Sequence, residues 1–190
     1  MNVEEVFRRI VLHLNRQTIP YMLVGSFASA FYGASRSTRD VDIVINATSN
    51  QLRTLVTALQ SDGYYAELDA ALQAQRDESL FNVIDNDTGW KIDLIPRKSR
   101  PFSREEFERR QRVDFVHLSL FVASAEDVVV SKLEWAKLAQ SQRQIEDAAR
   151  ILRAQGPSID GGYLKRWISD LQLEAQWQDA CRIGGIGPQI

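Results

Sequence analysis

The stretch that decides the fold is YMLVGSFASAFYGASRSTRDVDIVI, residues 21–45. Its apolar ends predict two buried strands, over residues 21–24 and 41–45. Between them the chain opens with a Gly25-Ser26 turn and continues as a short helix. A strand, a helix and a second strand in close succession indicate an α/β fold, and the polar residues inserted between the apolar ones need a functional reason.

Acidic residues occupy one face of the second strand. Asp40 and Asp42 are two residues apart, so their side chains point to one face, while Val41 points to the opposite, apolar face. Asp93 occupies the same kind of alternating position in a later strand. Because converging carboxylates repel one another unless a cation compensates, we expect a hard divalent ion, Mg²⁺ above all, at this face. The alternative for each single aspartate is a solvated position on an exposed sheet face.

The Gly25-Ser26 turn supplies a second kind of group. A strand followed by a tight turn and a helix start presents backbone N–H groups and a hydroxyl to an anion. Turns of this composition are also common as purely structural turns. Combined with the acids of the following strand, the turn predicts a site in which one part binds phosphates and the other part binds metal ions.

The order of these motifs resembles a known superfamily. Gly25-Ser26 is followed by RSTRDVD over residues 36–42 and by KID over residues 91–93. A hydrophobic-Gly-Gly/Ser turn, a short helix, Asp-x-Asp and a third acid on a later strand are the pattern of the polymerase-β-type nucleotidyltransferases. The chain is similar to that superfamily over about residues 20–96, which implies a mixed β-sheet flanked by helices.

The resemblance also implies roles for the acids. Asp40 and Asp42 would hold two Mg²⁺ ions that bridge the phosphates of a nucleoside triphosphate (NTP), and Asp93 would complete one metal site and activate the attacking hydroxyl. In such sites the metals neutralise the charge of the transferred group and align it with the nucleophile. The implied reaction is transfer of a nucleoside monophosphate from the NTP to a hydroxyl, with release of pyrophosphate.

Phosphate ligands are implied around the turn. By the same resemblance, Gly25 and Ser26 would grip the β- and γ-phosphates of the NTP, and Arg36 and Arg39 would add phosphate contacts. The alternative for either arginine is a solvated side chain or a pair with a neighbouring acid.

A second motif lies in the C-terminal part of the chain. The segment SKLEWAKLAQSQRQIEDAARIL, residues 131–152, resembles the helical motif of AbiEii-like nucleotidyltransferases, many of which are toxins of toxin–antitoxin pairs. This resemblance implies that Lys132 binds the nucleotide and that Asp147 lies near the site. A solvated helix face is the alternative for both residues.

Two regions of the chain differ in character. Residues 1–123 predict an α/β nucleotidyltransferase core with a mixed sheet, and residues 124–190 predict a C-terminal helical region. Within the core we expect a helix over residues 50–60 with Ser49 as its N-cap. A capping box at Ser103 is expected to open another helix.

Several chemically interesting side chains are expected to be structural. His13 is predicted on the polar side of the first helix, and without a nearby Cys or His it does not indicate a zinc site. Trp135, Trp167 and Trp177 have the spacing of helical core residues, and Cys181 is expected to be a small apolar core residue.

Composition limits the classes of partner. The chain has 190 residues and a formal net charge of −2, so no global basic surface points to nucleic acid. No apolar run approaches the ~20 residues that cross a bilayer, and the N-terminus does not match a signal peptide. A single cysteine fits a reducing compartment. We therefore expect a cytoplasmic protein with no membrane partner.

The sequence leaves the acceptor open among a small molecule, a protein side chain and a tRNA end. The expected ligands are thus an NTP, Mg²⁺ and an unidentified acceptor, with an antitoxin as a possible protein partner. The alternative function is a non-catalytic nucleotide-binding or toxin–antitoxin partner protein on the same fold. The three acids favour the enzyme, because a site without catalysis has no need for them.

Overall fold

The structure is a computed structural model that describes residues 3–187. The chain divides into two compact units. The first unit runs to Val24 and resumes over Ser37–Val122, and the second comprises Gly25–Arg36 and the chain from Ala123 onward. The second unit thus takes up a short segment that lies between two strands of the first.

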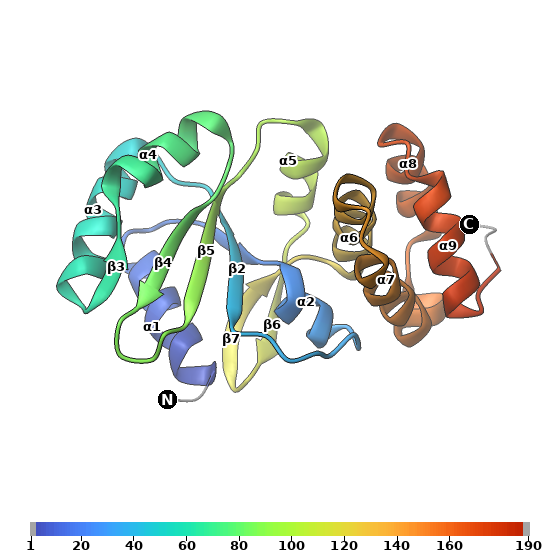
Figure 1. The fold of residues 1–190 in the computed structure, drawn as a ribbon, viewed down its shortest axis with the longest axis horizontal. Helices are drawn as coiled ribbons and strands as arrows, with labels where there is room; N and C mark the ends of the chain where they lie inside the picture. Colours follow the sequence, from blue (N-terminus) through green and yellow to red (C-terminus); the bar gives the residue numbers. More distant parts are fainter. Residues whose placement is uncertain (1–2, 188–190) are drawn as a thin grey trace. The chain divides into compact units, whose positions relative to one another are not determined.

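The first unit is built on a mixed β-sheet (Figure 1). Its strands are β1 (Tyr21–Leu23), β2 (Asp40–Ile45), β3 (Tyr64–Ala66), β4 (Phe81–Asp85), β5 (Lys91–Pro96), β6 (Gln111–Phe115) and β7 (Leu118–Val122). Within the described residues these form one seven-stranded sheet in the order β3-β4-β5-β2-β1-β7-β6. The pairs β2–β5 and β1–β7 are parallel, whereas the other neighbours are antiparallel. The predicted α/β fold class with a mixed sheet is confirmed.

Alternation along β2 separates a core face from a polar face. Val41, Ile43 and Ile45 are at most 1% exposed. Asp40 and Asp42 alternate with them and are exposed and half-buried, respectively. The apolar residues of β2 therefore anchor the strand in the core and leave its aspartates on the opposite face, as a period of two requires.

Four helices of the first unit accompany the sheet (Figure 1). They are α1 (Val3–Arg16), α3 (Ser49–Ser61), α4 (Leu68–Asp77) and α5 (Pro101–Glu108). The N-cap of α3 is Thr48 rather than the predicted Ser49, because the Thr48 hydroxyl accepts from the backbone N–H of Gln51 in a capping box. The predicted capping box at Ser103 is wrong, because α5 already begins at Pro101, whose fixed φ suits the first helical position.

The second unit is helical. Its helices are α2 (Gly25–Phe31), α6 (Ala125–Ala139), α7 (Gln142–Gln155), the 3₁₀ turn η1 (Gly156–Ser158), α8 (Gly161–Asp170) and α9 (Glu174–Gly184). Helix α2 packs on α6 and α7, so the segment that follows β1 is held by the C-terminal helices. Gly33 has a φ of +102° and approaches α7 so closely that a Cβ would lie 2.6 Å from the Cβ of Ala154. Only glycine fits at this position.

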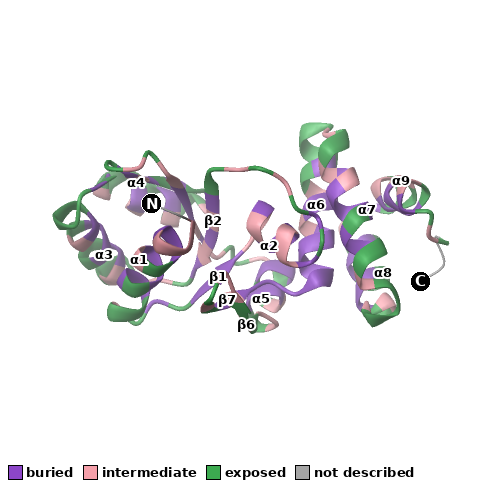
Figure 2. Ribbon diagram, turned by 90° about the horizontal axis from the view of Figure 1, so that it is seen from below, coloured by how far each residue is buried: buried purple, intermediate pink, exposed green. Residues whose placement is uncertain are grey.

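Two predictions about core residues are wrong. Trp135 is 58% exposed, although Trp167 and Trp177 are buried as predicted. A helical period identifies the apolar face of α6 but not which other elements cover that face. The end of α6 is largely exposed (green in Figure 2). His13 is 5% exposed rather than on a polar face. Cys181 is buried as predicted, and burial raises the pKa of its thiol to about 11.

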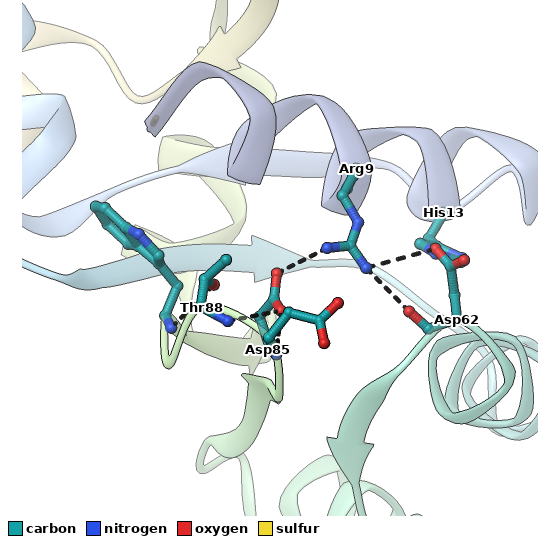
Figure 3. A network of polar contacts seen from close by, with 7 residues as sticks. Arg9, His13, Asp62, Asp85 and Thr88 are labelled. Atoms are coloured by element: carbon teal, nitrogen blue, oxygen red, sulfur yellow. Dashed lines mark hydrogen bonds and ion pairs between the residues drawn. The ribbon is translucent and has the colours of Figure 1, made fainter. Parts of the chain in front are cut away.

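The burial of His13 belongs to a polar network between α1 and the β3–β4 edge of the sheet (Figure 3). The Nε2 atom of His13 lies 2.9 Å from Oδ2 of Asp62. Arg9 donates to the fully buried carboxylate of Asp85 at 2.8 Å and to the backbone oxygen of Asp62 at 2.9 Å. The other Asp85 oxygen accepts backbone N–H groups of the turn between β4 and β5. This network joins α1 to the hairpin that carries β5.

The network predicts a pH dependence of stability at acid pH. The hydrogen bond from His13, helped by the charges of His13 and Arg9, lowers the pKa of Asp62 below its ordinary value of 3.8. The unfolded state therefore binds more protons below about pH 4, so stability is present above that pH and falls as the pH drops through the folded pKa. Asp62→Asn should flatten the acid limb of a plot of melting temperature against pH. The exposed Asp170→Asn is the control, and an unchanged acid limb in Asp62→Asn would contradict the assignment.

Candidate active site

The two acidic strands lie side by side and in register. Strands β2 and β5 are parallel neighbours, in which Asp42 pairs with Asp93 and Asp40 pairs with Lys91. Because in-register residues of adjacent strands point to the same face, Asp40, Asp42 and Asp93 share one face of the sheet, here called the acid face. The structure thus brings together the three carboxylates that the sequence predicted, from positions about 50 residues apart.

Lys91 lies on the acid face and compensates part of its charge. Its Nζ donates to Oδ2 of Asp93 at 3.0 Å and lies 3.8 Å from Oδ1 of Asp40. The hydrogen bond to Asp93, helped by the charges of the three aspartates, raises the pKa of Lys91 above its ordinary value, against an opposing effect of desolvation. The lysine is therefore a cation held among carboxylates.

Asn82 completes the surroundings of Asp93. It pairs with Asp93 across the antiparallel strands β4 and β5, and its Nδ2 donates to Oδ1 of Asp93 at 2.5 Å. Both carboxylate oxygens of Asp93 are thus engaged, one by the amide and one by the Lys91 ammonium. The residue as a whole is 7% exposed, so these contacts fix the orientation of a carboxylate that is mostly shielded from water.

The donor set of the acid face fits a hard divalent cation. Its ligands are carboxylate oxygens on neighbouring strands, which is the chemistry that Mg²⁺ takes in proteins. In residues 3–187, no three His, Cys, Asp or Glu side chains converge closely enough to enclose a metal ion. On the acid face the Lys91 ammonium takes the position between Asp40 and Asp93 that a cation would need. A bound metal would therefore require the carboxylates and Lys91 to rearrange.

Three predicted phosphate ligands of the second unit, Ser26, Arg36 and Lys132, are joined through Asp147 in a cluster that is here called the Asp147 network. Asp147 is 1% exposed and Lys132 is 5% exposed, and Nζ of Lys132 donates to Oδ2 of Asp147 at 3.0 Å. Nε of Arg36 lies 3.6 Å from the same Oδ2 atom, and Nη2 of Arg36 donates to the hydroxyl of Ser26. Asp147 therefore connects two predicted phosphate-binding cations to the serine of the turn.

Gly25 and Arg39 have simpler surroundings. Gly25 opens α2 with a φ of +63°, a conformation that favours glycine at this turn. Its carbonyl accepts the Ser29 hydroxyl at 2.8 Å. Arg39 is exposed, and its backbone carbonyl accepts the N–H of Lys91 at 3.4 Å just ahead of β2. The exposure of Arg39 leaves its role as a phosphate ligand a prediction.

The sequence prediction overlooked two residues of the site. Lys91 stands in the quoted KID motif, and its spacing of two from Asp93 already placed both on one strand face. Asn82 had no comparable signal, because its contact depends on the register of the β4–β5 hairpin. Register across a hairpin follows from the turn, and the five-residue connection left it open.

A matching family model and solved structures of the same fold place this protein in a class, the polymerase-β-type nucleotidyltransferases. A family model described as "Nucleotidyltransferase of unknown function (DUF6036)" matches residues 1–172. The chain belongs to this family, and it is an enzyme of the nucleotidyltransferase class. The resemblance drawn from the motifs is thereby confirmed at the level of the superfamily. No curated protein matches the sequence significantly.

Solved structures with the same fold share little sequence with this chain. The antibiotic-resistance factor ANT(2'')-Ia is similar with a TM-score of 0.64 and 11% identity, over 89% of this chain and 90% of that one. An antigenic nucleotidyltransferase-like protein from Paracoccidioides brasiliensis has a TM-score of 0.58 and 16% identity, over 95% and 92%. The lincosamide antibiotic adenylyltransferase LnuA has a TM-score of 0.55 and 12% identity, over 80% and 96%. At these identities the likeness establishes the fold.

Across the part of the chain that the structure describes, none of the helices combines the length and the apolar character that a bilayer crossing demands.

Proposed function

We propose that this protein transfers a nucleoside monophosphate from an NTP to a hydroxyl group of an acceptor, in a Mg²⁺-dependent reaction that releases pyrophosphate. The observation that carries the proposal is the register of β2 and β5, which puts Asp42 beside Asp93 and Asp40 on the same face. Membership of a nucleotidyltransferase family supports the reaction class. We place the reaction in the cytoplasm, where NTPs and Mg²⁺ are available.

The acids of the acid face would have two tasks. Asp40, Asp42 and Asp93 would hold two Mg²⁺ ions, which supply charge neutralisation for the triphosphate. Asp93 would also accept the proton of the attacking hydroxyl. Its fixed orientation suits this role, because Asn82 holds one carboxylate oxygen and leaves the second to Lys91, a more mobile partner.

The phosphates would bind to residues around the turn and in the C-terminal helices. Gly25 and Ser26 would offer backbone and hydroxyl donors, and Arg36 and Lys132 would offer positive charge. The contacts of Arg36 with Ser26 and Asp147 support this role, because they hold the guanidinium in one orientation. The exposed Arg39 would add a phosphate contact from the edge of β2.

A small hydroxylated molecule is the acceptor that we propose to test first. Two proteins of similar fold have names that concern antibiotics. The antibiotic-resistance factor ANT(2'')-Ia has also been solved in complex with adenylyl-2''-tobramycin, and LnuA is described as a lincosamide antibiotic adenylyltransferase. Both names concern small acceptors, and both make ATP the first donor to try. The net charge of −2 also disfavours a large polyanionic acceptor.

Nucleotide and metal are expected to stabilise the protein together. In a thermal-shift assay, one of ATP, CTP, GTP or UTP should raise the melting temperature with Mg²⁺ and much less without it. Asp40→Asn combined with Asp42→Asn should remove that increase. Absence of a shift with every nucleotide would instead favour a non-catalytic partner protein, such as one half of a toxin–antitoxin pair.

The acceptor is identified by transfer of label. The purified protein is incubated with Mg²⁺, α-labelled NTPs and fractionated cell extract, and label is sought in metabolites, proteins and RNA. Label in the small-molecule fraction, absent with the double aspartate variant, is the expected result. Label in tRNA or in a protein would identify a different acceptor class and would contradict the choice of a small molecule.

A further inference from the structure

The acid face contains one group that neither the motif nor the proposed reaction uses. Lys91 precedes Asp93 by two residues in β5, pairs in register with Asp40, and points to the same face as the three carboxylates. Its ammonium contacts the carboxylates of Asp40 and Asp93 in the described structure. A cation at this place bears directly on metal binding, because Mg²⁺ would need the same oxygens.

The two contacts of Asp93 differ in how readily they can be broken. Asn82 reaches Oδ1 with a short side chain from the paired strand, so its position is set by the β4–β5 register. Lys91 reaches Oδ2 with a four-carbon side chain that is 39% exposed, so its ammonium can swing into solvent. The Asp93 carboxylate that it leaves is 7% exposed and would then need another cation. Oδ2 of Asp93 is therefore the oxygen that can be released.

We propose that Lys91 is an exchangeable cation of the acid face, which compensates part of the carboxylate charge while no metal is bound and leaves Oδ2 of Asp93 when a divalent ion binds. The inference rests on the proposed function, because it assumes that the acid face takes a metal. Lys91 would then be a positioning residue: it keeps mutually repelling carboxylates folded on one face, and it makes metal binding a competition between two cations.

Removing the ammonium should have two opposite effects. Lys91→Met keeps most of the length of the side chain but removes the positive charge beside Asp40 and Asp93, so the metal-free protein should melt at a lower temperature. The same variant no longer competes with the metal, so its affinity for a divalent ion should rise about fivefold, the size expected for the loss of one partly exposed ion pair. A lysine with a purely structural role would lower the melting temperature alone.

The test is a titration with Mn²⁺ in the absence of nucleotide, in which the electron paramagnetic resonance signal counts the free ion. The full chain is compared with Lys91→Met, and Lys91→Gln is a polar variant that replaces Lys91→Met if that protein does not fold. Lys91→Arg keeps the positive charge and should bind Mn²⁺ about as the unaltered chain does. Lys98→Met is the matched control, because it removes the same charge from an exposed position beyond the end of β5.

The outcomes separate this inference from the proposed function. Tighter Mn²⁺ binding in Lys91→Met or Lys91→Gln, with Lys98→Met unchanged, supports the exchange. Unchanged or weaker binding in the neutral Lys91 variants overturns it, as does the absence of Mn²⁺ binding in every Lys91 form. Asp42→Asn tests the proposed function separately: if Mn²⁺ binding is unaffected by this substitution, the metal does not bind at the acid face and the proposed metal site is wrong.

Discussion

Asp42→Asn is expected to reduce nucleotidyl transfer on the order of 10³-fold, the size seen when one charge-stabilising group is removed from a phosphoryl-transfer site. Asp42 stands in register with Asp93 and two residues after Asp40, so it is the central carboxylate of the acid face. Asparagine keeps the shape of the side chain and removes its charge. The loss should therefore fall on the turnover number, with little change in the fold.

The measurement is the rate of label transfer to the acceptor identified above, or of pyrophosphate release. Circular dichroism and the melting temperature confirm that the variant is folded. Asp114→Asn is the matched control, because Asp114 is an exposed aspartate in the middle of β6. Strand β6 is an edge strand of the sheet and is separated from β2 by β1 and β7. Full activity of Asp42→Asn would remove the acid face from the reaction.

The acid face could be predicted from the sequence because its pattern is local. Strand alternation alone put Asp40 and Asp42 opposite Val41, and the same rule applied to Asp93. That β2 and β5 are neighbours in parallel did not follow from either strand. The parallel pairing joins segments about 50 residues apart, so it is a property of the sheet topology that only the structure supplies.

Contacts between segments far apart in the sequence could not be predicted from such local patterns. The salt bridge between Lys132 and Asp147 joins residues 15 positions apart, and the contact of Arg36 with Asp147 joins residues more than 100 positions apart. The helical period of α6 does not predict burial at these positions: Lys132 is buried, whereas Trp135 is exposed. The difference depends on which helices cover each turn of α6, and that is a property of the tertiary fold.

Charge compensation recurs in both units. On the acid face a lysine stands among three carboxylates, and in the Asp147 network one carboxylate stands among several cations. Each cluster therefore keeps a net charge without a ligand, negative on the acid face and positive in the Asp147 network, and its ion pairs compensate only part of that charge. A ligand at either cluster would have to replace ion pairs that are now formed within the protein.

Asp147→Asn is expected to destabilise the protein by about 3 kcal/mol, because it removes the charged carboxylate from a buried ion pair with Lys132. Asp147 and Lys132 are each at most 5% exposed and their charged atoms are 3.0 Å apart. The charges of Arg36 and Arg150 also lie within 4 Å of the Asp147 carboxylate. For a chain of this size such a loss corresponds to a decrease of roughly 6–12 °C in melting temperature.

A double variant distinguishes charge from packing. Replacing both partners, as in Asp147→Leu with Lys132→Met, removes both charges of the pair, so this protein should be more stable than Lys132→Met or Asp147→Leu alone. Scanning calorimetry of the four proteins measures the comparison. A double variant that loses the sum of the two single effects would mean that the two residues act independently, and that the buried charge pair is not what holds α6 to α7.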